Sequence, residues 1–234
     1  MTRTVLITGA SRGIGLETSM TFARGNDNIS CIVMVARPSQ RFDDAVERVR
    51  SITNNVQIVP IEADLSDPDV VPGIYDKLEE TGARINILVN NAGFTKPASI
   101  GETHISDFEL TMRVNLYSPF RFIQEALRRD HPIEQVVNIA STAGINGRAG
   151  WLTYSASKAA VINMSEVLRE ELSPFGIDVI CLSPGRCATD LRRVLAPDED
   201  PTTIMQPGQM AQIIATVISD TGRLLKSQNL VVRA

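Results

Sequence analysis

Tyr154 and Lys158 are the residues of this sequence whose types and spacing best suit proton transfer. They bracket the segment Tyr154-Ser155-Ala156-Ser157-Lys158, and an i, i+4 spacing places both on one face of a helix. Tyrosine alone is a weak acid with a pKa of about 10. A fixed ammonium beside the phenol would stabilise the phenolate, and lowering the pKa by roughly three units requires about 4 kcal/mol. The pair could therefore protonate a carbonyl oxygen while hydride reaches the carbon.

Ser141 is the third candidate for this chemistry. It follows the apolar run that ends in Asn138-Ile139-Ala140. Ligands bind at the carboxyl ends of strands in open α/β sheets, so its hydroxyl could orient the substrate oxygen beside Tyr154. A lone Tyr-x-x-x-Lys is often only a solvated helix face, but the added serine favours a catalytic site.

A glycine-rich turn near the N-terminus predicts a dinucleotide site. It follows the first apolar run and opens a helical segment, where backbone amides can meet a pyrophosphate. Glycines are needed there because a Cβ would block the tight turn or hold the backbone away from the phosphate. The same turn could be a plain strand-to-helix connection, but its place in an alternating chain favours the cofactor. The predicted cofactor contacts in the turn are Gly9, Ser11, Arg12, Gly13, Ile14 and Gly15.

Arg37 predicts which dinucleotide binds. Sites specific for NAD place a carboxylate at the end of the second strand to hold the ribose 2′-hydroxyl, whereas an arginine accommodates a 2′-phosphate. Here the sequence reads Val35-Ala36-Arg37. Arg12 could supply a second guanidinium to the same phosphate, which suits its planar, bidentate geometry. We therefore expect NADPH/NADP⁺ rather than NADH, although both arginines could instead be solvated surface residues.

The elements that must position these residues alternate along the chain. Short runs rich in Val and Ile alternate with amphipathic segments, which is typical of βαβ units around a buried parallel sheet. This predicts an α/β, doubly wound fold with a seven-stranded parallel sheet and helices on both faces. The expected strands are Thr4–Thr8, Ser30–Ala36, Gln57–Glu62, Ile85–Asn90, Gln135–Ala140, Ile177–Leu182 and Leu230–Val232. The expected helices are Gly15–Arg24, Arg41–Ser51, Asp67–Thr81, Ser106–Arg129, Tyr154–Leu172 and Gly208–Ser219.

Three features interrupt this pattern. Pro72 and Gly73 weaken the third expected helix, and Pro119 is expected to kink the fourth. The stretch Arg186–Pro207 is the one long region whose composition is typical of a loop, and we expect it to act as a lid over the binding site. With no linker or repeat, residues 1–234 are expected to form a single domain.

Composition bounds the partners. The 234 residues are 43% hydrophobic and 21% charged with a net charge of −4, which is ordinary for a globular protein and gives no basic face for nucleic acid. The apolar runs are too short to cross a membrane, and we expect a cytoplasmic protein that acts on a small molecule. Cys31, Cys181 and Cys187 are scattered, so neither a disulfide framework nor a metal site is expected.

Together these motifs resemble the short-chain dehydrogenase/reductase family over essentially the whole chain. The resemblance implies a three-layer Rossmann-like fold and an NADP-dependent oxidoreductase that interconverts a carbonyl compound and an alcohol. The motifs that carry it are Thr8–Gly15, Asp64 after the third strand, Asn90-Asn91-Ala92-Gly93 after the fourth, Asn115 in Arg113-Val114-Asn115-Leu116, Ser141, Tyr154 with Lys158, and Pro184-Gly185 with Thr189.

The resemblance also implies individual roles. Tyr154 would be the acid and base, Lys158 would also hold the nicotinamide ribose, and Asn115 would shape a kink that anchors a proton-relay water. Asp64 would meet the adenine, although it could instead cap a helix. The remaining implied cofactor contacts are Leu65, Asn91, Ala92, Gly93, Pro184, Gly185 and Thr189, with Thr189 at the carboxamide.

The substrate is less constrained than the cofactor. The pocket is expected to be lined by the loop after Ser141 and by the lid, with Gly144, Ile145, Asn146, Trp151, Leu191 and Leu195 as candidates. This favours a small ketone or aldehyde, although Trp151 could simply pack under the loop.

Two alternatives remain open. One is a 3-oxoacyl-[acyl-carrier-protein] reductase, although Phe175 stands where those enzymes commonly have a basic residue; the arginines that could substitute are Arg128, Arg129, Arg192 and Arg193. The other is a non-catalytic NADP(H)-binding regulator on the same fold.

The sequence also departs from the family. Arg186 and Cys187 replace residues that are often apolar, so packing of the lid beside the nicotinamide is expected to be unusual. Residues 228–234 replace an Asp-Gly-Gly ending that often helps form a tetramer, so either a homodimer or a homotetramer is compatible.

Overall fold

The Val- and Ile-rich segments form one parallel sheet of seven strands, in the order β3-β2-β1-β4-β5-β6-β7. The computed structural model describes residues 2–25, 28–225 and 229–233, so Gln228 and Ala234 of the C-terminal segment lie outside the described residues. The strands are β1 Arg3–Thr8, β2 Ile29–Ala36, β3 Gln57–Glu62, β4 Ile87–Asn90, β5 Gln135–Ile139, β6 Asp178–Pro184 and β7 Leu230–Val232. The predicted seven-stranded parallel sheet is confirmed, and each expected strand is found.

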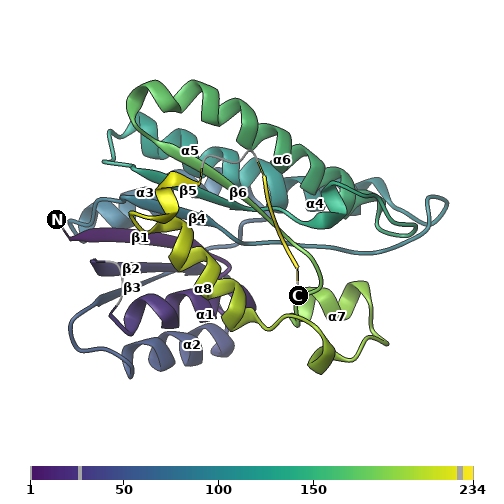
Figure 1. Ribbon diagram of the computed structural model, residues 1–234, viewed down its shortest axis with the longest axis horizontal. Helices are drawn as coiled ribbons and strands as arrows, with labels where there is room; N and C mark the ends of the chain where they lie inside the picture. The colour runs from purple at the N-terminus through teal and green to yellow at the C-terminus, as the bar shows by residue number, and fades with distance from the viewer. Residues whose placement is uncertain (1, 26–27, 226–228, 234) are drawn as a thin grey trace.

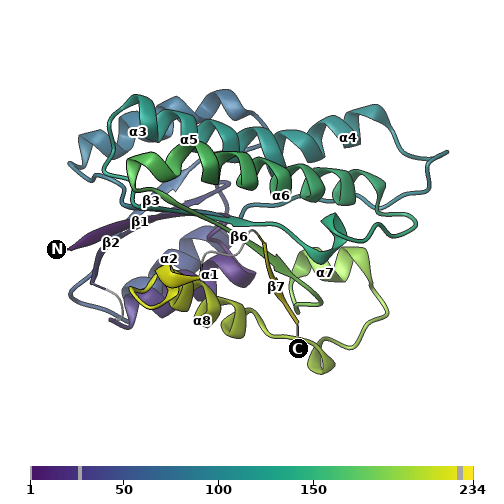
Figure 2. The ribbon, with the colours of Figure 1, turned by 45° about the horizontal axis from the view of Figure 1, so that its top comes forward.

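Side chains alternate between the two faces of this sheet, and each face packs against its own helices. On β1, Val5 and Ile7 belong to one buried cluster and Leu6 to the other. The helices are α1 Gly13–Ala23, α2 Gln40–Arg50, α3 Val71–Glu80, α4 Ile105–Met112, α5 Ser118–Arg128, α6 Leu152–Leu172, α7 Asp190–Leu195 and α8 Pro207–Ile218. Figures 1 and 2 show α1, α2 and α8 on one face and α3 to α6 on the other, giving three layers.

The fourth expected helix is continuous but contains a π-helical turn just before Pro119. α4 ends at Met112, a π-helical turn spans Arg113–Tyr117, and α5 begins at Ser118. Proline lacks an N–H and its ring crowds the carbonyl four residues earlier, so the irregularity falls on the turn that precedes Pro119. The prediction of one helical segment over Ser106–Arg129 is confirmed to within one residue at each end, and its widened turn contains Asn115.

The third expected helix also begins differently. Asp67 caps a short 3₁₀ turn, Pro68–Val70, by accepting a hydrogen bond from the Asp69 N–H at 3.0 Å. α3 then starts at Val71, which places Pro72 in its first turn, where a missing N–H costs nothing.

The expected lid is partly helical. Within Arg186–Pro207 the chain forms α7 and a 3₁₀ turn at Pro201–Thr203. Thr189 caps α7 by accepting the Arg192 N–H at 3.1 Å. α7 stands apart from both helical layers, beside the ends of β6 and β7 (Figure 2), so the lid presents a rigid turn of helix to the sheet edge.

Candidate active site

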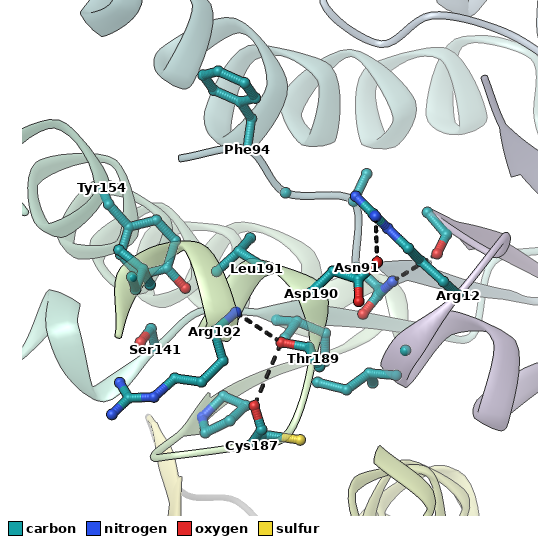
Figure 3. Close-up of a pocket in the computed structure, with 18 of the residues that line it drawn as sticks. Arg12, Asn91, Phe94, Ser141, Tyr154, Cys187, Thr189, Asp190, Leu191 and Arg192 are labelled. Atoms are coloured by element: carbon teal, nitrogen blue, oxygen red, sulfur yellow. Dashed lines mark hydrogen bonds and ion pairs between the residues drawn. The ribbon is translucent and has the colours of Figure 1, made fainter. Parts of the chain in front are cut away.

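The predicted site residues gather in one cleft of about 1220 Å³ at the carboxyl ends of the strands. It opens where β1 and β4 lie side by side, the point at which the strand order reverses and where open α/β sheets bind ligands. Of the predicted catalytic and cofactor-binding residues, Gly15 and Asn115 do not line this cleft, whereas all the others do. Figure 3 shows Tyr154 and Ser141 toward one end of the cleft and Arg12 and Asn91 toward the other.

Tyr154 lies in the first turn of α6 and is only 6% exposed. Burial raises the pKa of its phenol, while a hydrogen bond with Ser141 and the positive charge of Arg192 act to lower it. The net direction is upward, which is opposite to the expectation that Lys158 lowers it. The cation that acts on the phenol comes from the lid.

Lys158 is 4% exposed and its ammonium is directed at the backbone. Nζ donates a hydrogen bond to the carbonyl of Ile139 at 2.7 Å and lies 5.9 Å from the centre of the Tyr154 ring. Burial lowers the pKa of Lys158 to about 8. The expected shared helix face is present, but in this structure the ammonium stabilises the end of β5 rather than the phenol oxygen.

Asn115 clamps three segments together from inside the π-helical turn. Its Oδ1 accepts the Phe94 N–H at 2.8 Å, and its Nδ2 donates to the Phe94 carbonyl at 3.0 Å and to the Ser157 hydroxyl at 2.9 Å. The side chain is buried. It therefore ties the loop after β4 to α6, and this positioning role was not visible in the sequence.

The glycines of the N-terminal turn are needed because other backbone lies against them. Gly9 and Gly13 have φ of +69° and +55°. A Cβ on Gly9 would lie 2.9 Å from the Cα of Ala92, and one on Gly15 would lie 2.4 Å from the Gly9 carbonyl oxygen. Gly15 thus shapes the turn without lining the cleft.

Thr8 and Asn91 hold this turn against the loop after β4. The Thr8 hydroxyl accepts the backbone N–H groups of Asn91 and Ala92, each at 3.0 Å, and the Asn91 amide donates to the Thr8 carbonyl at 2.9 Å. Asn91, Ala92 and Gly93 line the cleft, as expected for cofactor contacts, and also fix the turn.

A carboxylate of the lid bridges two arginines across the cleft. Asp190 accepts from Arg12 at 2.5 Å and from Arg41 at 2.9 Å. Burial acts to raise the pKa of Asp190, but the charge of Arg12 and then that of Arg41 lower it overall. Arg37 also lines the cleft. Neither Arg41 nor Asp190 was singled out from the sequence.

The remaining predicted cofactor residues line the cleft and also have local structural roles. Asp64 accepts the Ser66 N–H at 3.0 Å, which is a capping contact of the kind weighed against adenine binding. Thr189 caps α7. Leu65, Pro184 and Gly185 complete the wall.

The expected substrate pocket is partly correct. Asn146, Trp151, Leu191 and Leu195 line the cleft. Gly144 does not, because its Cα faces α6, where a Cβ would lie 2.5 Å from the Lys158 carbonyl carbon. Ile145 is 46% exposed and lies outside the cleft lining.

Two arginines on the substrate side were not predicted to line the pocket. Arg148 and Arg192 both stack on the Trp151 ring, with their guanidinium carbons 5.1 and 5.4 Å from its centre. Nε and Nη2 of Arg192 donate to the two carboxylate oxygens of Glu199 at 2.5 and 2.7 Å. The lid therefore brings an ion-paired arginine to the site, and the loop before α6 brings a second arginine.

The unusual lid residues have ordinary structural partners. Nη1 of Arg186 lies 3.4 Å from Oε1 of Glu199. Cys187 is buried, and its backbone pairs with that of Met205 in an isolated parallel β-bridge. Cys31, Cys181 and Cys187 are all buried, unpaired thiols. Across residues 2–25, 28–225 and 229–233, three or more metal-ligating side chains do not cluster, and no helix of the same ranges is long and apolar enough to cross a membrane.

Comparison with known proteins places the site in a family. Residues 3–200 match the family model described as short chain dehydrogenase. A 3-oxoacyl-[acyl-carrier-protein] reductase of Synechocystis is 31% identical over 188 residues, which is 80% of this chain and 74% of that protein.

Two solved structures share the fold over nearly the whole chain. A short chain dehydrogenase of Burkholderia cenocepacia in complex with NADP has a TM-score of 0.86 at 27% identity, covering 99% of this chain and 96% of that one. A 4-hydroxyisoleucine dehydrogenase complexed with NADH also has a TM-score of 0.86, at 22% identity over 99% of this chain and 97% of that one. This second similarity shows the fold alone.

Proposed function

Because the chain belongs to the short-chain dehydrogenase/reductase family of oxidoreductases, we propose that it transfers hydride between NADPH and the carbonyl of a small ketone or aldehyde, in either direction. The observation that carries the proposal is the buried Tyr154 beside Ser141 in the cleft that the glycine turn also lines. A phenol held there can donate a proton to a carbonyl oxygen only if the carbonyl lies against it, and the cleft offers that place.

The cleft fits a nicotinamide dinucleotide. The glycine turn and the first two residues of α1, Gly13 and Ile14, line the cleft, and the amides at the N-terminus of a helix suit a phosphate. When bound, the dinucleotide supplies the hydride. Arg12, the loop at Asn91 and the cap at Thr189 are the protein groups that would hold it.

The substrate oxygen would be oriented and protonated by three side chains, those of Tyr154, Ser141 and Lys158. Ser141 orients the oxygen, Tyr154 gives up or accepts its proton, and Lys158 holds positive charge behind the phenol. In reduction the phenol of Tyr154 is the proton donor: burial raises its pKa and favours the protonated form, while Ser141 and Arg192 act to lower the pKa and so make the proton easier to release. In the direction of alcohol oxidation, the cations of Arg192 and Lys158 would have to favour the phenolate.

The arginines support NADPH over NADH. Arg37 directly follows β2, where NAD-specific sites place an acid, and Arg12, Arg37 and Arg41 all line the cleft. A 2′-phosphate would meet these guanidinium groups in competition with the carboxylate of Asp190, which bridges Arg12 and Arg41. Comparable kcat/KM for NADH and NADPH would contradict this preference.

A panel of small ketones, aldehydes and diketones, followed by NADPH absorbance, tests the activity. The proposal expects turnover of some members with NADPH and weaker turnover with NADH. Tight NADPH binding without oxidation across the whole panel would instead favour a non-catalytic NADP(H)-binding regulator.

The relative named 3-oxoacyl-[acyl-carrier-protein] reductase supports a second candidate. Such a reductase would need basic residues near the cleft to bind the acidic carrier. In this chain two of the candidate arginines are already in ion pairs, Arg129 with Asp76 and Glu79, and Arg192 with Glu199. Phe175, at the position that is commonly basic in those enzymes, is 77% exposed. An acetoacetyl thioester of acyl-carrier protein, assayed against simple diketones, separates the two candidates.

We also propose a homo-oligomer. Large apolar side chains are exposed on neighbouring helices, with Tyr117 and Phe120 near 48% and 46% and Val167 at 49%. Light scattering on the purified protein distinguishes a dimer or tetramer from a monomer, and a monomer would refute the proposal.

A further inference from the structure

Arg148 is a guanidinium on the Tyr154 side of the cleft that forms no ion pair with any other residue of the described ranges. It lines the same cleft as Ser141 and Tyr154 and is exposed to it. Among the residues that the structure describes, no Asp or Glu oxygen lies within ion-pair distance of Arg148. Arg192, by contrast, forms an ion pair with Glu199 through two short hydrogen bonds, and its side chain is only 12% exposed.

The indole of Trp151 holds Arg148 in place. The guanidinium carbon lies 5.1 Å from the ring centre, within the range of a cation–π contact. The loop that carries Arg148 is anchored before α6. The Ala98 N–H donates to the Gly150 carbonyl at 2.9 Å, and the backbones of Ala98 and Trp151 pair in an isolated β-bridge. A guanidinium stacked on an anchored ring loses little freedom when it binds a ligand, and its planar fork matches the two oxygens of a carboxylate.

Position on the loop assigns Arg148 to the substrate and not to the dinucleotide. Trp151 immediately precedes α6, and Tyr154 lies one helical turn further on. The glycine turn and Arg12 lie toward the opposite end of the cleft (Figure 3). The cleft is lined by both polar and apolar side chains, and the apolar ones include Phe94, Leu191, Leu195, Ile204 and Met205. These apolar side chains accommodate a short hydrocarbon segment, with Tyr154 at the carbonyl and a cation available for a charged group.

We infer that Arg148, held on Trp151, binds a carboxylate of the substrate, so that the carbonyl compounds accepted here are oxo acids and the alcohols are hydroxy acids. This inference rests on the proposed carbonyl reduction. A simple ketone leaves the guanidinium of Arg148 solvated and gains nothing from it, whereas an oxo acid forms charge-assisted hydrogen bonds that the ketone lacks.

Trp151 provides a binding assay that does not depend on turnover, because it is the single tryptophan of the chain. The NADP⁺-loaded protein is titrated with butanoate and with butanamide, which has a similar shape without the charge, while indole fluorescence is recorded. Butanoate is expected to change the fluorescence with saturation, and butanamide is expected to bind at least about tenfold more weakly. Arg148→Gln should abolish the difference. Arg48→Gln is the matched control, since Arg48 is an exposed arginine on α2 that does not line the cleft.

Turnover supplies the second readout. A series of oxo acids with increasing spacing between the ketone carbon and the carboxylate is assayed with NADPH, each acid beside its methyl ester. One or more acids should be preferred over their esters, and Arg148→Gln should raise KM for those acids about ten- to hundredfold while leaving the esters within about twofold.

The outcomes separate this inference from the proposed function. Reduction of ketones and esters with no preference for acids, or equal loss for acids and esters in Arg148→Gln, overturns the inference and leaves the proposed function standing. Arg148-dependent binding of butanoate without reduction of any carbonyl compound supports the carboxylate site and refutes the reductase. Loss confined to an acyl-carrier thioester in Arg148→Gln also overturns the inference, because Arg148 would then contact a protein.

Discussion

Replacing Asp190 with Asn is expected to tighten NADPH binding while leaving NADH binding nearly unchanged. Asp190 holds Arg12 at 2.5 Å and Arg41 at 2.9 Å. If these guanidinium groups also bind the 2′-phosphate, the phosphate must compete with the carboxylate for them. NADH has no such phosphate and does not depend on their release.

The magnitude follows from how exposed the two ion pairs are. The side chains of Arg12 and Arg41 are 51% and 59% exposed, and that of Asp190 is 34% exposed. Exposed ion pairs contribute about 0.2–1 kcal/mol each, so breaking both costs roughly 0.4–2 kcal/mol. Removing that cost should lower the Kd for NADPH about two- to thirtyfold. The effect should shrink at high salt, because exposed pairs are screened.

Isothermal titration of wild type and Asp190→Asn with NADPH and with NADH measures the difference. Asp198→Asn is the matched control, because Asp198 is an exposed acid of the same lid segment that does not line the cleft. Equal changes for NADPH and NADH, or no change for NADPH, would show that the bridged arginines do not bind the 2′-phosphate.

Three further perturbations follow from the same geometry. Gly144→Ala should destabilise the protein by about 1–3 kcal/mol in urea unfolding, since its Cβ would lie 2.5 Å from the Lys158 backbone, whereas Gly147→Ala, with nothing within 4 Å, should be neutral. Because burial lowers the pKa of Lys158 to about 8 from 10.5, the unfolded chain binds this proton more tightly between those values. The unfolding free energy should therefore rise from pH 8 toward 10.5 relative to that of Lys158→Met, and parallel pH profiles would refute the shift. Asn115→Leu removes both hydrogen bonds to the Phe94 backbone and should lower the unfolding free energy by about 2–4 kcal/mol. An unchanged melting temperature would show that these hydrogen bonds do not stabilise the fold.

The sheet was predictable because its strands are buried on both faces and therefore appear as continuous apolar runs. Their order and the cleft at their carboxyl ends follow from the alternation of strands and helices. The irregularity that Pro119 predicts lies in the π-helical turn before it, because proline disturbs the preceding turn whereas the sequence marks only the proline itself.

Other features of the site depend on contacts between distant residues. Arg41 and Asp190 are separated by 149 positions, and nothing in either local sequence indicates that they meet. The pKa of Tyr154 was predicted in the wrong direction, since the burial that raises it arises only from the tertiary fold. Gly144 was expected to line the pocket because of its loop, whereas α6 packs against it.

Tyr154→Phe tests the central claim most directly, because it removes one hydroxyl and keeps the ring that fills the cleft. NADPH affinity should stay within about twofold of wild type, while kcat for carbonyl reduction should fall about 10²- to 10⁴-fold, the contribution expected of a positioned proton donor. A variant that binds NADPH and reduces the same carbonyl compound at a rate comparable with wild type would show that the phenol of Tyr154 is not the proton donor.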